Sequence, residues 1–112
     1  MVQACIAILA LCALVIMSLR ANGRFKNVDR LPMQWSLDKS VNWTAPRAFA
    51  LAFTPLLAAI VLAATVTATL VLTPRPGQEG LKVPAVAFIA FVFIAAHALH
   101  LWLISRSLRQ ID

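Results

Sequence analysis

The chain has 112 residues, of which 62% are hydrophobic and 12% are charged, and its mean hydropathy is +0.86. A soluble domain of this length would need a polar face on each helix, which this composition does not provide. The formal net charge of +6 does not indicate binding to nucleic acid, because the basic residues flank apolar runs and form no separate patch. Anionic lipid head groups are the expected partners of these residues.

Three uncharged runs extend from Met1 to Leu19, from Ala48 to Pro74 and from Val83 to Ser105. About 20 apolar residues cross a hydrocarbon core of about 30 Å, so each run is long enough to span a membrane. We expect an all-α integral membrane protein with three transmembrane helices in a single domain. The expected segments are helices over about 2–19, 47–73 and 84–105, a partly structured connector over 20–46, a loop over 74–83 and a tail over 106–112.

The first run is expected to be a mature helix and not a cleaved leader. No Lys or Arg precedes its apolar core, and Leu11 stands before Cys12, where a lipoprotein cleavage site needs a small residue. Cys5 and Cys12 lie seven positions apart, which is about 10.5 Å along a helix and too far for a disulfide. They are interpreted as small apolar packing residues.

The connector carries most of the charge, and we expect the first helix to end into it at Ser18, Arg20, Asn22 and Gly23. It also carries Trp35, Trp43, Leu31 and Leu37, which a flexible linker would not. We interpret it as a folded re-entrant or interface-lying cap with its aromatic residues at head-group level.

The basic residues predict an orientation in the membrane. The connector holds six Lys or Arg residues and the tail two, whereas the loop between the second and third helices has only Arg75 and Lys82. Because basic residues near helix ends favour the cytoplasmic side, we expect a cytoplasmic connector and C-terminus and an external N-terminus.

The second helix is expected to start with Thr44 as its cap and Pro46 in its opening turn. Pro55 should bend it, because proline cannot donate to the carbonyl four residues earlier. Ala59, Ala63 and Thr67 recur every four residues and form a narrow strip that allows close approach of another helix. That helix could belong to this chain or to a partner protein.

The third helix, opened by Pro84, carries His97 and His100 on one face and Trp102 at the interface. His97 is the deeper of the two, and its imidazole could ligate haem or a bacteriochlorophyll magnesium, or donate to a neighbouring carbonyl. His100 lies near the helix end, where a solvated or snorkelling role suffices. No metal site is expected, because a tetrahedral zinc site needs more ligands and the cysteines lie at the other side of the membrane.

The connector sequence Leu31-Pro32-Met33-Gln34-Trp35-Ser36-Leu37-Asp38, followed by Asn42 and Trp43, resembles a loop motif in the uncharacterised N-terminal domain of SdpI-type immunity proteins. It departs from that motif at Gln34, where a histidine is usual, and at Lys39-Ser40, where a glycine is expected. The resemblance implies a bacterial inner-membrane protein of unknown biochemical activity.

No standard catalytic signature is present, and we do not expect an enzyme. The leading hypothesis is an accessory subunit of a larger bacterial membrane complex, respiratory or photosynthetic, that packs against partner helices and lipid. One alternative is a stand-alone immunity or signalling protein of the SdpI type. Another is a carrier of haem or bacteriochlorophyll through His97.

Overall fold

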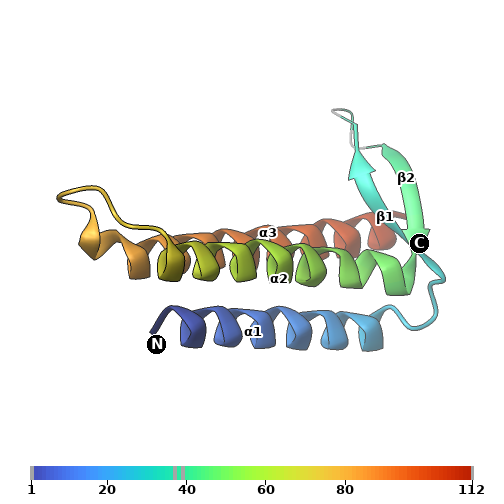
Figure 1. Ribbon diagram of the computed structural model, residues 1–112. Coiled ribbons are helices and arrows are strands. Elements are labelled where there is room, and N and C mark those ends of the chain that lie inside the picture. Colours follow the sequence, from blue (N-terminus) through green and yellow to red (C-terminus); the bar gives the residue numbers. More distant parts are fainter. Residues whose placement is uncertain (1, 37, 39, 112) are drawn as a thin grey trace.

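The computed structural model describes residues 2–36, 38 and 40–111, so Leu37 and Lys39 of the loop motif lie outside the described residues. The chain forms three helices and a β-hairpin (Figure 1). In order, the elements are α1 (Val2–Arg24), β1 (Arg30–Trp35), β2 (Val41–Pro46), α2 (Arg47–Val71), the short 3-10 helix η1 (Glu79–Leu81) and α3 (Lys82–Ile111).

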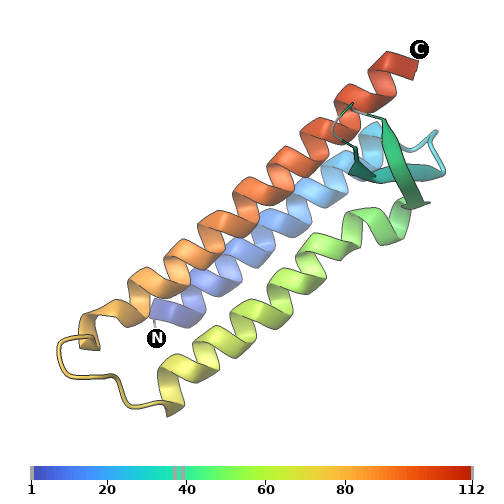
Figure 2. The same ribbon diagram turned by 90° about the horizontal axis from the view of Figure 1, so that it is seen from above.

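The three helices pack side by side, and α1 contacts both α2 and α3 (Figure 2). They contain 23, 25 and 30 residues, which correspond to about 34, 37 and 45 Å at 1.5 Å per residue. Each is long and apolar enough to cross a membrane. The prediction of three such helices is confirmed, and their arrangement is compatible with a multi-pass membrane protein.

The purely α-helical fold class was wrong for the connector, which contains a two-stranded antiparallel sheet. Leu31 pairs with Ala45 across the hairpin, and both side chains are buried. Pro32 is tolerated in β1 because each strand of a two-stranded sheet has a free edge. Apolar side chains at alternate positions of β1 lie toward the helices, and the partly buried ones are Met33 and Trp35.

The helix boundaries also differ from the predicted ones. α1 continues past Leu19 to Arg24, a favourable residue beside the negative end of the helix dipole. Thr44 does not cap α2, because it lies in β2 and its hydroxyl accepts a hydrogen bond from Arg30 Nε at 3.0 Å. α3 continues to Ile111, and Leu108 packs against the buried cluster beneath the hairpin.

Two buried clusters occupy the interior. The cap cluster lies under the hairpin and consists of Ala21, Phe25, Leu31, Ala45, Ala50, Leu51, Leu101 and Ile104. The distal cluster lies toward the other end of the bundle and consists of Ala7, Ala10, Leu14, Ala58, Leu62, Val86 and Ala90. Met17 packs against both clusters and joins them.

The hairpin, the end of α1, the start of α2 and the end of α3 meet at one end of the molecule (Figure 1). The connection between α2 and α3 lies at the opposite end with the N-terminus. The basic connector and the basic tail therefore share one end, as the sequence predicts.

Candidate functional site

Arg47 holds the root of the hairpin against the end of α1. Its Nε donates to Asn22 Oδ1 at 2.8 Å, and its Nη1 donates to the carbonyls of Phe25, Lys26 and Val28 at 3.2, 2.9 and 2.8 Å. A cation is unfavourable in the first turn of its own helix, but here it lies beside carbonyl oxygens that follow the negative end of α1. Arg47 thus fixes the positions of α1, the hairpin and α2 relative to one another.

Trp35 fixes the hairpin to α3. Its indole Nε1 donates to Ser107 Oγ at 2.7 Å, and its ring meets His100 edge to face, with ring centroids 5.9 Å apart. The His100 ring also lies against the backbone carbonyl of Pro32. His100 as a whole is half-buried, and its Nε2 atom is buried with no hydrogen-bond partner among the described residues. The expected solvated or snorkelling role of His100 stays a prediction.

One polar network joins all three helices at the boundary between the two clusters. The Ser18 hydroxyl donates to the Leu51 carbonyl at 2.7 Å. Because that hydroxyl has one proton, its oxygen accepts from His97 Nε2 at 2.8 Å. His97 is fully buried, and the network is a hydrogen-bonded link between α1, α2 and α3.

The His97 ring has one nitrogen committed and one open. In this arrangement Nε2 carries the ring proton and donates it in the hydrogen bond to Ser18 Oγ. In the neutral ring Nδ1 is then an acceptor, and it has no hydrogen-bond partner among the described residues. For His97 to ligate haem or bacteriochlorophyll, the fully buried ring would have to become accessible to a macrocycle. Ligation by either His97 or His100 stays a prediction.

Two large apolar side chains of β2 are exposed. Trp43 is 47% exposed and Val41 is 40% exposed, and the Trp43 indole donates to Gln34 Oε1 at 2.9 Å, which fixes the ring. At the tip, hydrogen bonds from Ser40 lower the pKa of the Asp38 carboxyl. We call the exposed side chains of Gln34, Val41 and Trp43 the hairpin face.

The three residues of the small-residue strip on α2 differ in their exposure. Ala63 and Thr67 are exposed, so they do not pack against the chain's own helices. Ala59 is half-buried and lines a groove of about 540 Å³ between α1 and α2, together with Ser18 and Pro55. The helix continues through Pro55. Contact of the strip with a partner helix stays a prediction.

Trp102, the third expected interface residue, lies on α3. It is 49% exposed, and the Arg106 guanidinium lies over its ring at 5.5 Å from the centroid. Among the predicted site residues, the structure brings Trp35 and His100 into contact, and it leaves the rings of Trp43 and Trp102 half-exposed.

Ser18 and Arg47 are the structurally important residues that the sequence pattern did not single out. Ser18 is the only hydroxyl-bearing residue in the first apolar run, which was a signal for a hydrogen bond inside the bundle. Arg47 is a cation in the first turn of a helix, where the dipole disfavours it. Such a position indicates that the side chain has carbonyl or carboxylate partners elsewhere.

No protein-family model, curated protein or solved structure matches this chain. The likeness of the connector to the SdpI-type loop therefore stays a prediction from the residues alone.

Proposed function

We propose that this chain is an accessory, non-catalytic subunit of a larger bacterial membrane complex, and that it docks to its partner through the hairpin face. The observation that supports the proposal is the rigid presentation of Trp43. Tryptophan is enriched at the centres of protein interfaces, and here its ring is half-exposed and held by Gln34. The strand that carries it leads directly into Arg47 and its four side-chain hydrogen bonds.

Preorganisation is the physical reason for expecting docking at this face. Binding through a flexible loop loses part of its free energy to ordering the loop, whereas a fixed ring avoids that cost. The hairpin is fixed twice, by Arg47 to the end of α1 and by Trp35 to Ser107 of α3. The exposed Ala63 and Thr67 on α2 offer a second contact, at which a partner helix could approach closely.

Native electrophoresis after gentle detergent extraction tests the proposal. The wild-type chain is expected to co-migrate with a large complex, and Trp43→Ala is expected to reduce that fraction. Phe53→Ala is the matched control, because Phe53 is a similarly exposed aromatic residue, 45% against 47%, on the side of α2. Equal loss in both variants would show that the hairpin face is not the docking site.

Migration of the wild-type chain only as a monomer or small homo-oligomer would contradict the subunit proposal. That result would favour the alternative of a stand-alone immunity or signalling protein. The haem or bacteriochlorophyll alternative has its own test, since a colourless purified chain would contradict it.

The proposed location is the bacterial inner membrane, with the hairpin and C-terminus in the cytoplasm. Eight Lys or Arg residues lie in the connector and tail, against two in the other connection. A cysteine introduced by Ser40→Cys, with Cys5 and Cys12 replaced, should resist an impermeant thiol reagent in intact cells. Ready labelling from outside would invert the orientation.

A further inference from the structure

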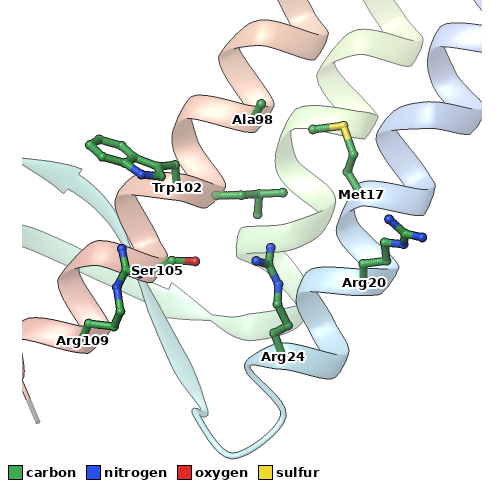
Figure 3. Close-up of a pocket in the computed structure, with 8 residues that line it drawn as sticks. Met17, Arg20, Arg24, Ala98, Trp102, Ser105 and Arg109 are labelled. Atoms are coloured by element: carbon green, nitrogen blue, oxygen red, sulfur yellow. The ribbon is translucent and has the colours of Figure 1, made fainter.

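A groove of about 750 Å³ runs between α1 and α3 at the hairpin end of the molecule (Figure 3). Its α1 wall is formed by Met17, Arg20 and Arg24. Its α3 wall is formed by Ala98, Leu101, Trp102, Ser105 and Arg109. No acidic side chain is among the described residues that line it.

The character of the groove changes along the helix axis. Met17, Ala98 and Leu101 line the part nearer the middle of the bundle, and Arg24 and Arg109 line the part nearer the helix ends. Ala98 and Arg109 are eleven residues apart on α3, which is about 16 Å along the axis. The groove therefore passes from apolar to strongly basic along the helix axis, as a phospholipid does from its acyl chains to its phosphate.

The basic end has the donors that a phosphate diester needs. Figure 3 shows the Arg24 and Arg109 side chains on facing helices, with Ser105 between them. Guanidinium groups bind phosphate through paired N–H donors. A second hollow of about 380 Å³ shares Arg24, Ser105 and Arg109 and continues toward Phe25 and Val28. The two hollows together leave space on both sides of the arginine pair.

We propose that this groove is a binding site for one anionic phospholipid, with the phosphate between Arg24 and Arg109 and an acyl chain along Met17, Ala98 and Leu101. Trp102 lies at the head-group level of the same lipid, where tryptophan is favoured. Because several arginines and no acidic side chain are among the described residues of the groove, a lipid with a net negative charge should bind more tightly than a lipid with none. The assignment requires insertion in a bilayer but no partner complex, so it can fail independently of the proposed subunit function.

Native mass spectrometry of the full-length protein in neutral detergent tests the assignment. Phosphatidylglycerol and phosphatidylcholine with identical acyl chains are offered separately. Phosphatidylglycerol is expected to bind about tenfold tighter or more, since several basic residues each contribute to attraction of an anionic head group. Equal binding of the two lipids would overturn the assignment.

Two double variants separate the site from the general positive charge. Arg24→Gln with Arg109→Gln should abolish most of the preference for phosphatidylglycerol. Arg75→Gln with Lys82→Gln removes the same amount of positive charge from the other end of the bundle. This variant should keep the preference for phosphatidylglycerol. Equal loss of preference in the two variants would show a non-specific charge effect and contradict the site.

A steric pair tests the groove without changing any charge. Ala98→Phe fills the apolar part and should weaken lipid binding, whereas Ala96→Phe, at an exposed position outside the lining, should not. This pair remains informative if the arginine variants are unstable. Undiminished binding by Ala98→Phe would overturn the placement of the acyl chain.

Glycerol phosphate distinguishes a lipid from a soluble phosphate compound. Because it lacks acyl chains, it should not displace phosphatidylglycerol at matched concentration. Displacement at matched concentration would mean that the arginines bind a free phosphate ester, and the lipid assignment would be wrong.

Discussion

The two ends of the bundle are held together by different interactions. At the hairpin end, Arg47, Trp35 and Arg30 make hydrogen bonds between segments far apart in the sequence. At the other end, the described hydrogen bonds of the α2–α3 connection and the adjoining turns of α2 join residues no more than four positions apart. The distal cluster is the richer of the two in small residues, with four alanines among its seven members against three among the eight members of the cap cluster.

The difference follows from the surroundings expected for each part. Inside a bilayer, association of helices depends on close packing, to which alanine is suited. At an interface with water, irregular backbone leaves carbonyl groups that need donors, and Arg47 supplies them. We therefore expect directional hydrogen bonds to determine the arrangement of segments at the hairpin end. At the other end, we expect close packing of apolar side chains to determine it.

Arg47→Ala is expected to have the largest effect. It removes four side-chain hydrogen bonds and should lower the free energy of unfolding by about 2–4 kcal/mol, because bonds from a charged donor are the strong ones. Denaturant unfolding in detergent micelles measures the loss. Arg47→Lys keeps the charge without the forked geometry and should recover less than half of it. Full recovery would mean that charge alone holds the hairpin root.

Ser18→Ala tests the link between the two clusters. It leaves His97 Nε2 and the Leu51 carbonyl without their described partner and should cost about 1–2 kcal/mol, near the upper range for hydrogen bonds between membrane helices. A double-mutant cycle with His97→Phe isolates the pair, and a coupling energy of about 1 kcal/mol is expected. Zero coupling would mean that the two residues stabilise the bundle independently.

Gly77→Ala probes the connection at the other end. Gly77 has a φ of 84°, where an alanine is strained, although no atom lies within 4 Å of an added Cβ. The expected cost is about 1 kcal/mol from the backbone alone. Gly80→Ala is the control, since Gly80 also has open space but lacks the positive φ. If the two variants lowered the unfolding temperature equally, the positive φ of Gly77 would not explain the loss of stability.

Trp43→Phe should have the smallest effect on stability, below about 0.5 kcal/mol, because the side chain is half-exposed. It removes the hydrogen bond to Gln34 but leaves the strand pairing in place. The change in the thermal unfolding temperature measures this effect on stability. A loss comparable with that of Arg47→Ala would show that the hairpin face supports the fold and is not free for a partner.

The sequence predicted the helices well and the connector poorly, for physical reasons. Uninterrupted apolar runs have few structural alternatives in a membrane, so their number and approximate position could be predicted. Leu31, Met33 and Trp35 alternate with other residues, as do Val41, Trp43 and Ala45, and that period of two is typical of strands. The pattern was visible, but the helical context favoured a different interpretation.

The contacts among Ser18, Leu51 and His97 could not be predicted from the sequence. They depend on the relative rotation and height of three helices, which hydropathy does not specify. Leu51 also contributes a backbone carbonyl, so its residue type carries no signal of the role. The helix ends were equally hard to predict, because Arg20 and Arg24 are good helix residues that continue α1 past its apolar part.

The partners of Arg47 carry a consequence for the order of assembly during synthesis. All of them precede it in the chain, between Asn22 and Val28 for the side chain and at Asp29 for its backbone N–H. The unit of α1, hairpin and α2 can therefore close before α3 has been made. Ser18 and Trp35 receive their α3 partners, His97 and Ser107, only afterwards. We therefore expect the last helix to dock on a unit that the Arg47 contacts have already closed.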